Sequence, residues 1–169
     1  MRNNKERWVI KAGSSLVAGT ESGINSLFIE SLVSQVNYLI EKDIEVILVS
    51  SGAVAKGMQE LNLKDRPSTL HLLQAAAAIG QMGLINAYQK ELDKFGLKAA
   101  QVLISHDDIS NRKRYLNARR SLETLLELNV MPIVNENDSV ATEEISFGDN
   151  DTLAGALVGL VSADKFIML

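Results

Sequence analysis

Four polar segments, most of them directly after a short apolar run, carry residue types that could bind an anionic small molecule. They span 11–15, 50–55, 135–138 and 148–152. In the first, Lys11 offers a mobile positive charge suited to a phosphate, and Gly13 lets the backbone approach a ligand closely. A surface lysine before a polar turn is the simpler interpretation. Neither the P-loop pattern nor the dinucleotide-binding glycine pattern occurs in the chain, so neither type of nucleotide site is indicated.

The second segment contains Ser51 and Gly52 between an apolar run and a segment with helical spacing. A glycine at a strand-to-helix turn exposes backbone N–H groups that can bind an anion. Turn chemistry with a serine cap explains the same residues equally well. The chain has no nucleophile-elbow pattern, so Ser51 is not indicated as a nucleophile.

The third and fourth segments are rich in Asn and Asp. Asn135 and Asp138 together could accept from an ammonium group and donate to a carboxylate, which matches an α-amino acid. An ordinary Asn/Asp turn is the simpler interpretation. Asp149, Asn150 and Asp151 precede an alanine-rich helix and could cap it, but three such residues exceed what one cap needs. A carboxylate there could hold a catalytic lysine or a magnesium ion.

Composition narrows the function classes. The chain of 169 residues suits one domain, and its 17 basic and 21 acidic residues give a net charge of −4. That balance argues against a nucleic-acid or anionic-membrane surface. The absence of cysteine excludes disulfides, thiolate zinc sites and cysteine nucleophiles, and two histidines make a metal cluster improbable. Without a signal peptide or a membrane-length apolar run, a soluble cytoplasmic protein is expected.

Short apolar runs alternate with longer segments of helical spacing. Ser26 is a candidate N-cap of the first helical segment, and Asn111 or Ser110 is a candidate N-cap of the fourth. Pro132 lies within a strand run, which favours a strand start or a sheet edge. His106 and the residues after Lys11 are interpreted as loops. Strands are predicted over 8–11, 45–49, 98–104, 130–134 and 165–169, and helices over 26–41, 53–61, 70–95, 111–128 and 151–160.

This alternation predicts the α/β class, as a three-layer α/β/α sandwich with a mainly parallel central sheet. The strands are apolar throughout, which is typical when helices cover both faces of a sheet. Ligands of such sheets bind beyond the carboxyl ends of the strands. The polar segments should therefore converge at one edge of the sheet, as a site for a polar small molecule requires.

The ordered set of motifs resembles the amino acid kinase superfamily and, within it, the glutamate 5-kinases. The resemblance rests on residues 11–15, 50–54, 135–138 and 148–151, with support from 115–119 and 163–165, and it covers essentially the whole chain. Each motif is weak alone, whereas the set in this order is specific. The resemblance implies an amino acid kinase-like fold, in agreement with the α/β/α sandwich inferred from the pattern of elements.

The resemblance also implies a reaction and roles for individual residues. Members of this family transfer the γ-phosphoryl group of ATP to the side-chain carboxylate of L-glutamate, with Mg²⁺, in the first step of proline biosynthesis. Proline acts as a feedback inhibitor, and a homo-oligomer is expected. The implied catalytic residues are Lys11 and Asp151. The phosphate of ATP would lie against Lys11, Gly13 and Ser14, and the implied glutamate-binding residues are Ser51, Asn135, Asp138, Asp149 and Asn150.

The family continues beyond the fifth strand with a Thr-Asp pair, a nucleotide loop and a second catalytic lysine, whereas this sequence stops at Leu169. Residues 1–169 are therefore expected to form the N-terminal, substrate-binding portion of the kinase domain. The ATP-binding portion is expected to be absent, and the chain alone to be inactive.

Three alternatives stay open at this point. The enzyme alternative is another amino acid kinase, such as an aspartokinase or acetylglutamate kinase. Those enzymes usually have two adjacent glycines in the first loop, where this chain has Ala12 before Gly13. For the chain taken alone, a non-catalytic module that binds glutamate or proline is the second alternative. A purely structural role is the third, and the polar segments at one sheet edge argue against it.

Overall fold

Five parallel strands form the centre of the molecule. The computed structural model describes residues 5–19, 23–140 and 149–169. Within these ranges the strands form one sheet in the order β3-β4-β2-β1-β5, and every neighbouring pair is parallel. The predicted α/β class with a parallel sheet is therefore confirmed. The strands are β1 (Arg7–Ala12), β2 (Glu45–Ser50), β3 (Lys98–Ile104), β4 (Val130–Glu136) and β5 (Lys165–Met168).

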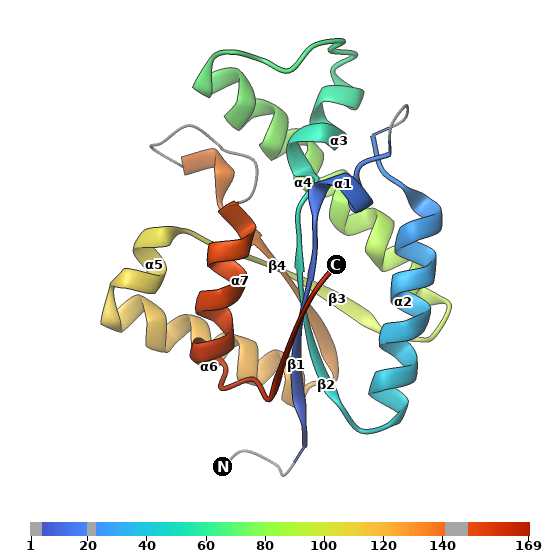
Figure 1. The fold of residues 1–169 in the computed structure, drawn as a ribbon, viewed down its shortest axis with the longest axis vertical. Coiled ribbons are helices and arrows are strands. Elements are labelled where there is room, and N and C mark those ends of the chain that lie inside the picture. The colour runs from blue at the N-terminus through green and yellow to red at the C-terminus, as the bar shows by residue number, and fades with distance from the viewer. Residues whose placement is uncertain (1–4, 20–22, 141–148) are drawn as a thin grey trace.

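Helices cover both faces of this sheet, which confirms the three-layer sandwich. Figure 1 shows α2 and α4 on one face, and α5, α6 and α7 on the other. No helix within the described ranges is long and apolar enough to cross a membrane. The helices are α1 (Ser14–Val17), α2 (Ser26–Glu41), α3 (Ala53–Glu60), α4 (Leu70–Asp93), α5 (His106–Ser110), α6 (Arg112–Glu127) and α7 (Asp149–Leu160), with a 3-10 helix η1 (Asp138–Val140).

The inner strands contribute to two apolar cores because neighbouring side chains point to opposite faces of the sheet. In β1, Val9 joins the core under α6 and α7, while Ile10 joins the core under α2 and α4. In β2, Ile47 likewise joins the core under α6 and α7, and Leu48 joins the core under α2 and α4. The continuous apolar runs in the sequence therefore reflect burial on both faces.

Several element boundaries differ from the sequence prediction. The N-cap of α2 is Asn25, not Ser26, since the Asn25 side chain accepts a hydrogen bond from the Phe28 N–H at 3.1 Å. Asn111 caps α6 as predicted, by accepting from two backbone N–H groups. Two short helices replace predicted loops: α1 begins at Ser14 and α5 begins at His106.

A capping box explains α5. The Ser105 hydroxyl accepts from the backbone N–H of Asp108, and the Asp108 carboxylate accepts from the Ser105 backbone N–H at 2.8 Å. Hydrogen bonds from the backbone and hydroxyl of Ser105, with a smaller contribution from Arg114, lower the pKa of Asp108. This local pattern of Ser followed three residues later by Asp was present in the sequence and marks a helix start.

Pro132 lies inside an interior strand that begins at Val130, so the expectation of a strand start or a sheet edge is wrong. β4 is flanked by β3 and β2, and Pro132 is in register with Ala100 of β3. The pairing of β4 with β2 begins only at Ile133. The missing N–H of the proline is tolerated because it precedes that ladder.

Helices α3 and α4 cross in direct backbone contact at two glycines. A Cβ at Gly80 of α4 would overlap the Ala53 carbonyl oxygen and the Gly57 backbone, and a Cβ at Gly57 would overlap the Ala76 carbonyl oxygen. Ala53 directly follows the Ser51-Gly52 turn. The glycine contact therefore holds α4 against the turn at the carboxyl end of β2.

Replacing Gly80 by alanine should destabilise the fold, because the added methyl group can be accommodated only if the two helices separate. Overpacking of this kind costs about 1–3 kcal/mol. Gly155→Ala in α7 is the matched control, since a Cβ there meets no described atom within 4 Å. Removing an exposed helix glycine should stabilise by up to about 1 kcal/mol. Chemical denaturation of both variants gives the two free energies of unfolding, and equal values would contradict the close contact.

Candidate functional site at the carboxyl edge of the sheet

The carboxyl ends of β1, β2 and β4, which are neighbours in the sheet, meet the beginning of α7. This edge holds Lys11 from β1, Ser51 directly after β2, and Asn135 from β4. Asn150 and Asp151 reach it from the first turn of α7. Segments far apart in the sequence thus contribute to one polar cluster, as the parallel topology predicts.

Lys11 and Asp151 form an ion pair at this edge. The Lys11 Nζ atom lies 2.6 Å from Asp151 Oδ1. The Lys11 side chain is only 12% exposed, whereas that of Asp151 is 50% exposed. The neighbouring strands β2 and β5 flank Lys11 on both sides. The pair therefore holds a largely buried ammonium group at a defined position with its carboxylate partner open to solvent.

Gly13 keeps the space beside the Lys11 ammonium group clear. A Cβ at this position would lie 3.1 Å from Lys11 Nζ. Gly13 is the N-cap of α1, and the partly exposed Ser14 is the first residue of that helix. An anion could therefore approach the ammonium group and the Gly13 backbone together, which is the combination that a transferred phosphate needs.

A hydrogen-bonded cluster of side chains lies beside the ion pair. The Asn150 amide Nδ2 donates to Ser51 Oγ at 2.7 Å and to Asn135 Oδ1 at 2.9 Å. Asn135 Nδ2 donates in turn to Gln81 Oε1 of α4 at 2.8 Å. Asn135, Gln81 and Asn150 are 2%, 7% and 8% exposed. We call these four residues, Ser51, Gln81, Asn135 and Asn150, the amide cluster.

Two adjacent residues of α7 serve the two halves of the site. Successive residues of an α-helix point about 100° apart. Asn150 accordingly faces the amide cluster, while Asp151 faces Lys11. An amino acid held by the cluster would lie next to the ammonium group of Lys11.

The turn after β2 brings backbone donors to the same edge. Gly52 has φ of +111°, a left-handed conformation that glycine adopts readily, and it is the N-cap of α3 without a side-chain cap. A Cβ at Gly52 would also lie 2.9 Å from a Val17 methyl group. The first N–H groups of α3 therefore lie beside Ser51 and are suited to a carboxylate.

Two more predicted residues need separate treatment. Asp138 begins η1, which packs against α4, so it lies at the same edge and is partly exposed. Asp149 is the first residue of α7, but its side chain is not among those described, and Gly148 lies outside the described residues. Their assigned roles stay predictions.

Sequence reasoning did not assign Gln81 to the site. It placed this residue only within the helix predicted over 70–95. The signal was nevertheless present: Gln81 follows Gly80 and shares helical spacing with Ala77 and Leu84, which are both buried. A polar residue on the buried face of a helix requires a partner, and Asn135 provides it.

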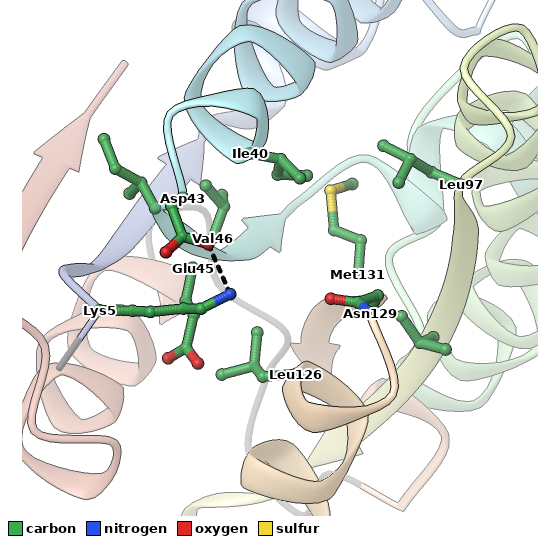
Figure 2. Close-up of a pocket in the computed structure, with 11 residues that line it drawn as sticks. Lys5, Ile40, Asp43, Glu45, Val46, Leu97, Leu126, Asn129 and Met131 are labelled. Atoms are coloured by element: carbon green, nitrogen blue, oxygen red, sulfur yellow. Dashed lines mark ion pairs between the residues drawn. The ribbon is translucent and has the colours of Figure 1, made fainter. Parts of the chain in front are cut away.

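A separate pocket lies at the opposite, amino edge of the sheet. It is lined by the starts of β2 and β4 and by the C-terminal ends of α2 and α6. Figure 2 shows the ion pair that Lys5 makes with Asp43, at 2.6 Å, beside the apolar side chains of Val46 and Met131. The pocket shares no residue with the amide cluster or the ion pair. Because ligands of open parallel sheets bind at the carboxyl edge, this pocket is not the candidate active site.

The residues present fit the phosphates of ATP better than a dedicated metal site. Lys11 supplies a positive charge, and Gly13 leaves room beside it. No group of three or more His, Asp or Glu side chains suited to a metal occurs in the part of the chain that the structure describes. Mg²⁺ that accompanies a nucleotide is held largely by phosphate oxygens and water, so such a group is not required.

The parallel sandwich with a lysine and an amide cluster at its carboxyl edge defines an α/β small-molecule-binding domain. The sequence profile of the amino acid kinase family matches residues 6–169, and the chain belongs to this family. It is similar to the glutamate 5-kinase of Hydrogenovibrio crunogenus, at 52% identity over 100% of this chain and 45% of that protein. The glutamate 5-kinase of Alcanivorax borkumensis is 51% identical over 98% of this chain and 44% of that protein. The chain thus spans slightly less than half the length of these relatives.

Proposed function

We propose that the protein containing this chain phosphorylates the side-chain carboxylate of L-glutamate with ATP, giving glutamyl 5-phosphate, the first step of proline biosynthesis. The observation that carries the proposal is the Lys11–Asp151 ion pair directly beside the amide cluster. The similarity to glutamate 5-kinases over the whole chain supports it.

The proposed chemistry divides between the two halves of the site. The amide cluster and the start of α3 hold and orient the amino acid, so that its side-chain carboxylate faces Lys11. Lys11 neutralises negative charge on the phosphoryl group during transfer, and Asp151 fixes the position of the ammonium group. ATP supplies the phosphoryl group. Positioning and charge neutralisation are the main requirements of such a reaction.

The enzyme alternatives are an aspartokinase or an acetylglutamate kinase. The single Gly13 after Ala12, in place of two glycines, favours glutamate as substrate. We also propose a cytoplasmic location, feedback inhibition by proline at or near the glutamate site, and a homo-oligomer. The exposed apolar side chains of Leu72, Ile79 and Met82 on α4 would suit a contact between copies.

Calorimetric titration of the chain with amino acids tests the proposed substrate. We expect L-glutamate to bind more tightly than L-aspartate by about tenfold or more, the range that one methylene group provides. N-acetylglutamate should also bind more weakly, because acetylation removes the ammonium donor. Ser51→Ala should weaken glutamate binding, whereas Ser34→Ala on the exposed face of α2 should not. Tighter binding of aspartate or N-acetylglutamate would refute the assignment to glutamate.

A further inference from the structure

A single backbone group sets the polarity of the amide cluster. The Glu136 N–H donates to Asn135 Oδ1 at 2.9 Å. A backbone N–H can only donate, so this contact fixes which end of the Asn135 amide is the oxygen. Asn135 Nδ2 must then face Gln81, and Gln81 must present its oxygen to it. On the other side, Asn150 must present its nitrogen to Asn135 Oδ1.

This polarity leaves one unused hydrogen-bonding atom at each end of the cluster. Gln81 Nε2 and Asn150 Oδ1 are both buried and have no hydrogen-bond partner among the described residues. One is a donor and the other an acceptor. Buried polar atoms are rarely left unpaired, so both point to groups that a ligand supplies.

The two unused atoms match the two charged groups on the α-carbon of an amino acid. An ammonium group can donate to Asn150 Oδ1, and a carboxylate can accept from Gln81 Nε2. Asn150 adjoins Asp151, which contacts Lys11, whereas Gln81 is two hydrogen bonds further along the cluster. The carboxylate next to Gln81 is therefore the one remote from the phosphoryl site, the α-carboxylate.

We propose that Gln81 is a substrate-binding residue that donates from Nε2 to the α-carboxylate of the bound amino acid. The proposal rests on the proposed function, since it takes an amino acid as the ligand. The backbone contact of Gly80 with the Ala53 carbonyl holds α4 against α3, next to the turn that carries Ser51, and Gln81 directly follows Gly80.

Two variants separate the functions of Gln81. Gln81→Glu keeps an acceptor for Asn135 Nδ2 but replaces the donor with a negative charge. Gln81→Met removes donor and acceptor with little change in volume. We expect each to weaken L-glutamate binding by about tenfold or more, as for the loss of a hydrogen bond to a charged group, and Gln81→Glu to weaken it more. Gln74→Met, on the same helix outside the cluster, is the matched control and should bind normally.

The test is calorimetry with L-glutamate and with 4-aminobutyrate, which lacks the α-carboxylate. Gln81→Met should weaken L-glutamate binding and leave 4-aminobutyrate binding unchanged. In two-dimensional ¹⁵N NMR, the side-chain amide signals of Gln81, identified by their absence in Gln81→Met, should shift when L-glutamate is added. Unshifted Gln81 signals under saturating L-glutamate, binding by the variants within twofold of the parent chain, or equal losses for both ligands would overturn the proposal.

These outcomes are distinct from a failure of the proposed function. If the parent chain prefers L-aspartate, the glutamate assignment fails, while the same comparison of Gln81 variants with aspartate still decides the role of Gln81. If no amino acid shifts the Gln81 signals, the role of Gln81 is refuted whichever substrate the site prefers.

Discussion

Replacing Lys11 by alanine, in the protein that contains this chain, is expected to lower kcat for glutamate phosphorylation by a factor on the order of 100 or more. The ammonium group is held 2.6 Å from Asp151 and is largely buried. It is therefore already positioned before the proposed reaction begins. Under the proposed function, Lys11 would contribute mainly to the transition state, where charge on the phosphoryl group is redistributed. The KM for glutamate should therefore change much less than kcat.

Lys165→Ala is the matched control for this prediction. Lys165 lies on the adjacent strand β5 but at its amino end, where it pairs with Glu6 at 2.9 Å. Its replacement should leave kcat unchanged. Steady-state kinetics of both variants, with melting curves to verify folding, make the comparison. A Lys11→Ala variant with a kcat near that of the parent would show that Lys11 is an ordinary buried lysine.

The second large effect is a separation between Asn150 and Asp151. Asp151→Asn keeps the shape of the side chain but removes the charge that positions Lys11, so kcat should fall by about tenfold or more while the KM for glutamate is little changed. Asn150→Ala removes hydrogen bonds to Ser51 and Asn135, contacts that exist before the reaction. It should raise the KM for glutamate first, by about tenfold or more.

Asp107→Asn controls for effects on helix stability. Like Asp151, Asp107 is exposed and lies in the first turn of a helix, but it belongs to α5. Loss of a favourable helix-dipole interaction or cap costs up to about 1 kcal/mol and should appear in melting curves without a change in turnover. If Asn150→Ala and Asp151→Asn lose only stability and keep normal turnover per folded molecule, both residues serve the helix and not the reaction.

The sequence by itself determined the five strands, the five longer helices and the edge at which the polar residues gather. Apolar runs such as 45–49 are buried on both sides because helices cover both faces of the sheet. Parallel strands carry their following residues to the same edge, so Lys11, Ser51 and Asn135 could be placed together without knowledge of the strand order. Local signals sufficed here because burial and chain direction are encoded residue by residue.

Only the tertiary structure decided which of these side chains touch. The contact of Asn150 with Ser51 joins residues 99 positions apart. Pro132 is tolerated in an interior strand because the pairing of β4 with β2 begins only after it. Gln81 lies next to Gly80, where α3 and α4 approach closely, and the sequence alone does not show this contact. One backbone N–H, that of Glu136, fixes the direction of every hydrogen bond in the amide cluster. Such contacts depend on packing distances of a few tenths of an ångström between distant segments, which spacing along the chain does not specify.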